Sequence, residues 1–403
     1  MGVISVRGRP LLGGGFCGTC DENEVCQYGQ CGAPCDSMCI SDLEQCVVSA
    51  MGSPVCVPVM VEVPAGAFWM GCNAALDGQC QVAEKPYHEV TLDSYRIDRT
   101  EVTNAQYTVF LNALQAAGTP NQCPYDETPQ ECYENGEGTM DLVYDGGTWS
   151  PVIGLESHPM VAVTWFGSRS FCLWAGKTLC TEAQWEKAAR GGCEANGGAA
   201  FCEAQSRIFP WEDGAPACDL AVFSGCGGGD QPVCSYSPAG DSPYGACDMA
   251  GNVSEWMADW FGFDYYQISP PTNPQGPSSN PSSARCMRGG SATTLPQFLR
   301  VSFRNNDNDW DGSGNRGFRC CGLGSCADGV CDAAAGENCV TCPQDCGCQP
   351  DEVCFDGTCC APDCDGKECG GDGCGNNTWV VTFSYAGVTT NVKDGSTYVR
   401  CVR

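Results

Sequence analysis

The sequence predicts an α+β protein in which a central domain with little regular secondary structure lies between two small disulfide-rich modules. Cysteine accounts for 36 of the 403 residues and is concentrated towards both ends of the chain. The middle of the chain contains only a few helical patterns. Elsewhere it consists of short apolar segments broken by glycine and proline. A chain of this length can still build one core that folds without disulfide support.

Charge excludes two classes of partner. The chain has 49 acidic and 20 basic side chains, a net charge of −29. Such a surface repels phosphate backbones and anionic headgroups, so we expect neither nucleic acid nor acidic membranes as partners. No apolar run reaches about 18 residues, so no membrane span is expected. Residues 1–15 show no readable signal peptide, yet the cysteine content predicts a secreted or cell-surface protein.

The cysteines are better explained by disulfides than by zinc. Cys17 and Cys20, like Cys339 and Cys342, have the two-residue gap of zinc knuckles. Each pair, however, lies among further cysteines at irregular gaps, and only His88 and His158 could complete metal sites. We therefore expect a framework of disulfides.

Four regions follow from these patterns. Residues 1–58 and 322–375 are predicted cysteine-rich modules, 59–321 is the central domain, and 376–403 is a C-terminal β segment that suits a hairpin. Residues 20–35 and 348–364 repeat one cysteine pattern, so the same unit brackets the central domain. These units resemble the cysteine-rich repeats of secreted bacterial surface proteins.

Within the central domain, residues 59–70 alternate like a strand and contain a turn at Pro64. Thr103 is a predicted N-cap for a helix that ends at Gly118. Residues 167–175 suggest a second helix, and Thr181 opens a capping box for a third that runs to Arg190.

The remaining stretches of the central domain are predicted as loops and buried strands. Cys72 and Cys80 suit a local loop, and Cys123 and Cys132 suit a clip inside the acidic insertion 119–157. Residues 193–247 look like loop held by local disulfides, whereas 287–304 suggest buried strands.

The stretch 243–260 is the densest in carboxylates, glycines and tryptophans. Carboxylates and main-chain carbonyls around a sharp glycine turn are the ligands that Ca²⁺ accepts. The candidate ligands are the side chains of Asp248 and Glu255 and the carbonyls of Gly251 and Val253. The alternative is a strand-turn-helix in which Trp256 and Trp260 bury one helical face while the two carboxylates are solvated.

A weaker calcium candidate is formed by Asp307, Asp309 and Asp311, which precede Gly312. Alternating oxygen ligands followed by glycine are typical of the first half of an EF-hand loop. The twelfth position, however, is Phe318 where that loop needs glutamate. A solvated acidic turn is the alternative that the sequence favours.

Several motifs in this order resemble the formylglycine-generating enzyme (sulfatase-modifying factor) family over residues 59–321. They are VPAGAFWMG from Val63, EKPYHEVTLDSYRIDRTEVTNAQYTVF from Glu84, HPMVAVTWFGSRSFCLWAGKTLCTEAQWEKAARGG from His158, GNVSEW from Gly251, RGGS from Arg288 and NRGFR from Asn315. The resemblance implies an α+β fold related to C-type lectins. It also implies a calcium ion at the site around Asp248 and Glu255.

The resemblance extends to disulfides and to a second calcium site. It implies a disulfide between Cys172 and Cys320, whereas the partners of the family's other bridge fall on Ala189 and Asn305. A ligand of the family's second calcium falls on Val222, so we expect that site to be absent.

The catalytic positions of the family are altered. Its two copper-binding cysteines fall on Thr294 and Leu299, and a site tryptophan falls on Ser254. Cu(I) needs soft thiolates, so we do not expect copper. An iron-dependent branch of the family needs a set of histidines that His88 and His158 alone cannot supply.

Two functions remain open. The first is a secreted, calcium-stabilised, non-catalytic module, a pseudoenzyme that binds a protein, peptide or glycan ligand at the cell surface. The face predicted to contact that ligand consists of Ser291, Thr294, Leu299 and Arg304. The alternative is an oxidoreductase of the family with an altered active site.

Overall fold

The computed structural model describes residues 39, 42–50 and 53–323, apart from 120, 124–129, 134–140, 205–206, 212–213, 281–282 and 313. Outside that range it describes the backbone of six short strands. Residues 19–25 and 31–324 form one compact unit, and residues 1–18, 26–30 and 325–403 form another. The cysteine pairs with zinc-knuckle spacing, for which disulfides are predicted, and most of the two cysteine repeats lie outside the described residues.

The three predicted helices are present. They are α1 (Asn104–Ala116), α2 (Trp165–Trp174) and α3 (Glu182–Arg190). Threonine caps each one: Thr103 and Thr181 form capping boxes with the glutamine three residues on, and Thr164 accepts a hydrogen bond from the Gly167 N–H at 3.0 Å. Because Thr164 is the cap, α2 begins before the predicted residue 167.

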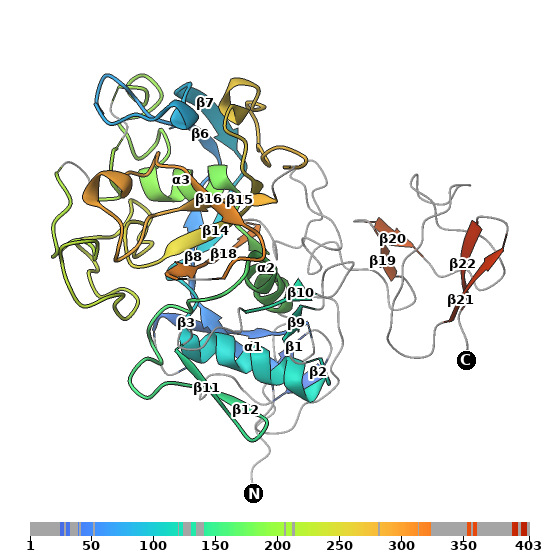
Figure 1. The fold of residues 1–403 in the computed structure, drawn as a ribbon. Helices are drawn as coiled ribbons and strands as arrows, with labels where there is room; N and C mark the ends of the chain where they lie inside the picture. The colour runs from blue at the N-terminus through green and yellow to red at the C-terminus, as the bar shows by residue number, and fades with distance from the viewer. Residues whose placement is uncertain are drawn as a thin grey trace, which may run out of the picture. The chain divides into compact units, whose positions relative to one another are not determined.

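Two four-stranded sheets organise the larger unit (Figure 1). The first has the order β13 (Thr178–Leu179), β18 (Cys320–Leu323), β8 (Tyr95–Asp98) and β5 (Met60–Val63), all antiparallel. The second has the order β16 (Asn305–Asn308), β15 (Ala284–Arg288), β14 (Ser254–Trp260) and β17 (Arg316–Gly317), with only β14 and β17 parallel.

Hairpins and single turns complete the described structure. The hairpins are β3 (Glu44–Val48) with β4 (Pro54–Pro58), β6 (Gly66–Met70) with β7 (His88–Leu92), β9 (Gln122–Cys123) with β10 (Gln130–Glu131), and β11 (Leu142–Asp145) with β12 (Thr148–Pro151). The 3₁₀ turns are η2 (Val82–Glu84), η3 (Tyr265–Gln267) and η4 (Pro296–Phe298). In the terminal segments β1 (Val25–Gln27) pairs with β2 (Gln30–Gly32), β19 (Val353–Phe355) with β20 (Thr358–Cys360), and β21 (Thr389–Lys393) with β22 (Ser396–Arg400).

Two local predictions are wrong. Residues 287–304 hold only the end of β15, because Gly289 and Gly290 turn the chain at φ +86° and +72° and η4 follows. The strand-turn-helix alternative for 243–260 fails as well. Trp256 and Trp260 lie on strand β14, whose pairing with β15 shifts register between them.

The main core lies between α1 and α2. Tyr107 and Phe110 of α1 meet Phe171 and Trp174 of α2, with ring centroids 5.4–5.8 Å apart, and Phe318 closes the cluster. All five side chains are almost fully buried. Burying each one contributes about 1.5–3 kcal/mol, so this aromatic cluster contributes strongly to the stability of this half of the domain.

Two long disulfides tie the helical region to β18. Cys172 of α2 bonds to Cys320, and Cys180, just after β13, bonds to Cys321. The first is the pairing that the family resemblance implies; the second is not. Local disulfides close the short loops Cys39–Cys56, Cys72–Cys80, Cys123–Cys132, Cys193–Cys202, Cys218–Cys226 and Cys234–Cys247. The last three hold the predicted loop region 193–247.

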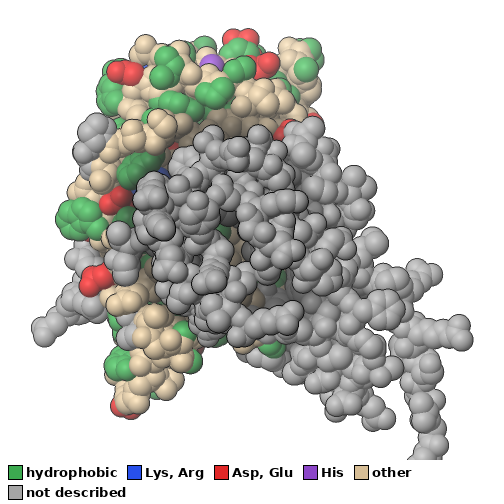
Figure 2. Space-filling model, turned by 90° about the vertical axis from the view of Figure 1, so that its right-hand side faces the viewer, with side chains coloured by type: hydrophobic (Ala, Val, Ile, Leu, Met, Phe, Trp, Pro, Cys, Tyr) green, Lys and Arg blue, Asp and Glu red, His purple; other side chains and the backbone are tan. Residues whose placement is uncertain are grey.

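One face of the described structure shows more acidic than basic side chains. On the face drawn in Figure 2, Asp and Glu side chains reach the surface at several separate points, and hardly any Lys or Arg is visible. Among the described residues, no helix combines the length and the apolarity needed to cross a bilayer.

Candidate calcium turn and altered active site

The turn Asp248–Asn252 leads into β14 and has a tightly specified backbone. Asp248, Gly251 and Asn252 have φ of +55°, +85° and +58°, a region that Gly, Asn and Asp tolerate best. A Cβ on Gly251 would lie 2.1 Å from the Val222 carbonyl oxygen, which accepts a hydrogen bond from the Asn252 N–H. Val222, the position of the family's second calcium ligand, therefore packs against this turn through its backbone.

Glu255, predicted as a calcium ligand, forms a fully buried ion pair. Arg319 donates from Nη2 to Oε1 and from Nε to Oε2 of Glu255, both at 2.8 Å. The Trp185 indole donates a third hydrogen bond to Oε2 at 2.9 Å. Both oxygens of Glu255 are thus occupied, and its charge is balanced by a guanidinium.

Asp248 is differently placed. It is buried, and its Oδ2 accepts a hydrogen bond from the Cys234 N–H at 2.6 Å. Burial raises the pKa of Asp248 to about 6, although that hydrogen bond and Arg319 act in the opposite direction. The Asp248 carboxylate, which forms no ion pair, is therefore the carboxylate at this turn that could bind a cation.

Glu101, which is not among the predicted site residues, lies two residues before Thr103, the N-cap of α1. Its side chain is 0 % exposed, and neither carboxylate oxygen has a hydrogen-bond partner among the described residues. Burial, followed by the nearby Asp248 carboxylate, raises the pKa of Glu101 well above its usual value. The sequence gives only a weak indication of a site at this glutamate, because it lies in the stretch that predicts the start of the helix.

The second calcium candidate does not gather around one point. Arg316 forms ion pairs with both Asp307 and Asp311, whereas Asp309 is buried and interacts with Arg285. Each carboxylate is thus partnered by a guanidinium, and the loop lacks the convergent oxygen set that calcium needs. Residues 307–311 do not fit a calcium ion.

The two copper positions of the family are brought together but cannot bind copper. A Cβ built on Gly290 would lie 2.9 Å from Leu299 Cδ2 and 3.2 Å from Thr294 Cγ2, so both side chains converge on this glycine. One offers a hydroxyl and the other a hydrocarbon. Neither is the soft ligand that Cu(I) requires, so the residues present do not fit copper.

Nearby sulfur does not replace the missing pair. Cys286 is the only free cysteine with a described position, and it is fully buried. Burial, followed by Glu182, raises the pKa of its thiol well above the usual value, which keeps it protonated. Cys321 is bonded to Cys180 and supplies no thiolate.

The predicted ligand face is mostly internal, so it needs correction. Leu299 is 0 % exposed, Ser291 is buried, and Arg304 forms a buried two-pronged ion pair with Glu182 at 2.7 and 2.8 Å. Of the four predicted residues only Thr294 is half-buried. The surface here is formed instead by Thr293, Leu295 and Gln297, because alternate residues of this turn point outwards.

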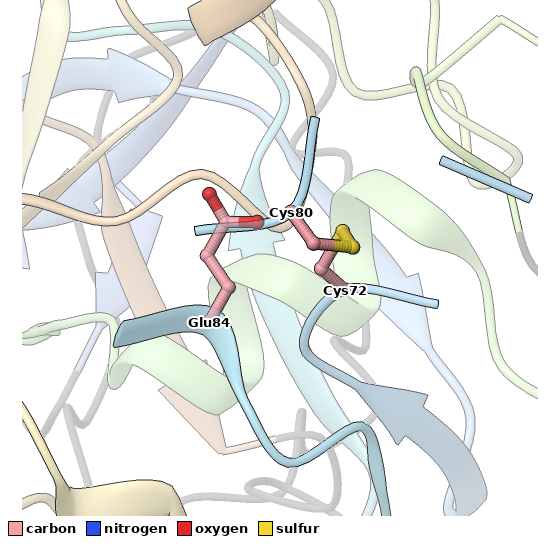
Figure 3. A group of neighbouring side chains, drawn as sticks. All are labelled: Cys72, Cys80 and Glu84. Carbon is pink, nitrogen blue, oxygen red and sulfur yellow. A yellow bond between two sulfur atoms is a disulfide. The ribbon is translucent and has the colours of Figure 1, made fainter. Parts of the chain in front are cut away.

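Cys72, Cys80 and Glu84 form a third group of metal-ligating residue types. In the described part of the chain they are the only set of three or more His, Cys, Asp or Glu side chains whose ligand atoms all lie within 4.8 Å of one another. Figure 3 shows that the two sulfur atoms are bonded to each other. Glu84 receives two hydrogen bonds from Arg300, each of 2.7 Å. A disulfide and a paired carboxylate do not make a metal site.

The chain is 33% identical over 290 residues to the formylglycine-generating enzyme of Streptomyces coelicolor, which covers 64% of this chain and 88% of that protein. It is 34% identical to the serine/threonine-protein kinase pkn1 of Chlamydia pneumoniae, covering 65% of this chain but 37% of the kinase. The solved structure of PvdO from Pseudomonas aeruginosa matches with a TM-score of 0.48 and 23% identity, over 65% of this chain and 93% of that one.

The family described as "Sulfatase-modifying factor enzyme 1-like domain" matches residues 49–322, which include both four-stranded sheets and the three helices. That match agrees with the motifs, with the α+β architecture related to C-type lectins and with the disulfide-rich loops. The chain therefore belongs to the formylglycine-generating enzyme family.

Proposed function

We propose that this protein is a secreted, calcium-stabilised member of the family that has lost the family's oxidative chemistry and acts as a binding module. The observation that carries the proposal is the pair Thr294 and Leu299 at Gly290. Both occupy the copper positions, and together they provide no thiolate. A copper centre that activates O₂ for cysteine oxidation needs such ligands.

Similarity alone does not assign the activity. Matched relatives include proteins named as a formylglycine-generating enzyme and as a protein kinase, so one domain type occurs in proteins with different names. Function has to be argued from the site, and the site here supports binding better than oxidation.

Calcium fits the turn at Asp248 on chemical grounds. The buried carboxylates Asp248, Glu255 and Glu101 lie near a single guanidinium, that of Arg319. Burying uncompensated charge is costly, and a divalent cation would remove the excess. When bound, the ion would stabilise the loop that leads into β14.

The test of lost oxidation is direct. Copper-loaded protein is incubated with O₂ and a cysteine-containing sulfatase-motif peptide, and mass spectrometry is used to look for the aldehyde. The Streptomyces coelicolor enzyme serves as positive control, and we expect no aldehyde from the wild-type chain. An aldehyde that disappears in Cys286→Ala would establish the alternative, an oxidoreductase with an altered active site.

The ligand of a binding module would be a protein, peptide or glycan at the cell surface. Leu295 is 50% exposed beside Thr293 and Gln297, so this turn is where contact is expected. Screening the wild type on a glycan array, with Leu295→Asp as the matched variant, tests the glycan class. Equal glycan binding by the wild type and Leu295→Asp would show that the ligand contacts a different surface.

A further inference from the structure

The disulfide Cys72–Cys80 differs from the other disulfides of the described chain in the acidic group beside it. One oxygen of Glu84 lies within 4.8 Å of both sulfur atoms (Figure 3). No other disulfide in that part of the chain has a carboxylate or an imidazole so close to both of its sulfurs. The arrangement is therefore particular to this loop and is not a general consequence of a cysteine-rich sequence.

A buried arginine holds the Glu84 carboxylate in this position. Arg300 donates from Nη2 to Oε1 and from Nη1 to Oε2 of Glu84, both at 2.7 Å. Oε2 also accepts a hydrogen bond from Ser302, whereas Oε1 accepts only the one from Arg300 among the described residues. One lone pair of Oε1 is therefore available to a metal ion while Arg300 stays in place. Carboxylate ligands of metal sites are ordinarily fixed by such outer hydrogen bonds.

A second carboxylate adjoins the sulfur of Cys72. Asp77, inside the loop that the disulfide closes, has its Oδ2 3.3 Å from Cys72 Sγ and 2.9 Å from Arg300 Nη1. A Cys72 thiol in this position would donate its proton to Asp77, and a Cys72 thiolate would lie 3.6 Å from Arg300 Nη1. Both forms of a reduced Cys72 therefore have a partner in the present geometry of the loop.

Reduction is the step that would turn these groups into metal ligands. A dithiol that reaches the half-buried Cys80 transfers two electrons and two protons to the disulfide. Two thiols form, and the sulfurs of the dithiol join in a new disulfide. A divalent metal ion that binds both thiols displaces their two protons. Two thiolates and a carboxylate, with water in the fourth position, match the ligands and the coordination number of zinc.

We propose that a dithiol converts the Cys72–Cys80 disulfide into a zinc site whose protein ligands are Cys72, Cys80 and one oxygen of Glu84. Arg300 and Asp77 orient these ligands without binding the metal. The loop is then closed in both states, by a covalent bond in the oxidised protein and by the metal ion in the reduced one. The site shares no residue with the calcium turn or the copper positions, so its failure would leave the proposed function standing.

Protection of the thiols by zinc tests the proposal on the full chain. The protein is treated briefly with dithiothreitol and freed of it by gel filtration. It is then alkylated in Zn²⁺ or in chelator, and the products are mapped by mass spectrometry. At free Zn²⁺ of about ten times the dissociation constant, mass action should slow the alkylation of Cys72 and Cys80 about tenfold. Chelator should restore the original rate.

The disulfide Cys218–Cys226 is the matched control, because it also joins cysteines eight residues apart and has no such carboxylate. Cys218 is exposed, so the dithiol should open this pair as well. Its thiols should be alkylated at equal rates with and without Zn²⁺. Equal protection of both pairs would show that zinc binds any reduced pair and would overturn the proposal, as would a lack of protection at Cys72 and Cys80.

Variants distinguish the ligands from their outer partners. Asp77→Asn should weaken zinc binding about tenfold or more, the usual cost of losing an outer partner, and Glu84→Gln should weaken it further. Because Glu84→Gln also disturbs the ion pair with Arg300, Cys80→Ser is a second variant that leaves this pair intact. Cys80→Ser should abolish the protection of Cys72. Unchanged zinc binding in Glu84→Gln, or a Cys72 that is still protected in Cys80→Ser, would contradict the ligand set.

The reduced site also has to form in the folded protein. Cys172 and Cys320 are fully buried, so mapping should find them still bonded when Cys72 and Cys80 are reduced. Near-ultraviolet circular dichroism of the reduced protein should then match that of the oxidised protein. If Cys72 and Cys80 become reduced only after the Cys172–Cys320 bridge has opened, the zinc site is not a state of the folded protein and the proposal is overturned.

Discussion

Removing the two long disulfides should cost more together than separately. Cys172–Cys320 and Cys180–Cys321 close loops of 148 and 141 residues that overlap almost completely, because Cys320 and Cys321 are adjacent. In the chain-entropy model, either bridge alone restricts the unfolded chain by about 5 kcal/mol. Once one bridge is present, the other closes a loop of only about nine residues, worth about 2.6 kcal/mol.

The variants Cys172→Ala/Cys320→Ala and Cys180→Ala/Cys321→Ala should therefore each lose about 2.6 kcal/mol of unfolding free energy from the entropic effect. The four-alanine variant should lose about 7.6 kcal/mol, an excess of about 2.4 kcal/mol over additivity. Replacing the buried sulfurs also costs packing energy, which adds to the loss of each variant. That energy largely cancels when the loss of the four-alanine variant is compared with the sum of the two double variants.

Guanidinium denaturation followed by tryptophan fluorescence measures the series. One fixed sucrose concentration keeps the weakest variant folded. The control pair Cys218→Ala/Cys226→Ala closes a separate eight-residue loop and should add to either long pair without excess. Strict additivity of the two long bridges, with unchanged denaturant slopes, would refute the shared-loop reasoning.

Three further predictions concern buried groups. Burial raises the pKa of Asp259 to about 7, so folding favours its protonated form. The stability that this carboxyl contributes is fully present below about pH 4 and is lost as the pH rises to 7. The loss in unfolding free energy amounts to about 4 kcal/mol. Unfolding free energies measured across that range should vary less in Asp259→Asn. Arg319→Met should cost about 3–5 kcal/mol by leaving Glu255 unpaired, and chemical denaturation should show most of it recovered in Arg319→Met/Glu255→Leu. Gly251→Ala should lower the melting temperature clearly more than Gly245→Ala, because both have positive φ but only Gly251 meets a backbone oxygen; equal shifts would count against that contact.

Local features of the fold could be predicted from the sequence because their causes are local. Thr103 and Thr181 marked helix starts, since a hydroxyl and a glutamine three residues later satisfy the first N–H groups. The motifs around Gly251 and Arg288 identified the family, and Thr294 and Leu299 showed that copper ligands are missing, because ligand chemistry depends on residue type alone.

Partner choice between distant segments was decided only by the tertiary structure. The sheets decide which distant segments meet, and this determines that Glu255 pairs with Arg319 and that Cys321 bonds to Cys180. It also leaves the Glu101 carboxylate without a hydrogen-bond partner among the described residues. The sequence predicted Arg304 as a residue of the ligand face, but in the structure it is buried in an ion pair with Glu182. The sequence by itself thus determined the family, the helix caps and the chemistry missing from the site. The structure decided which buried charges are balanced, because the net cost of burying a charge depends on neighbours that are far away along the chain.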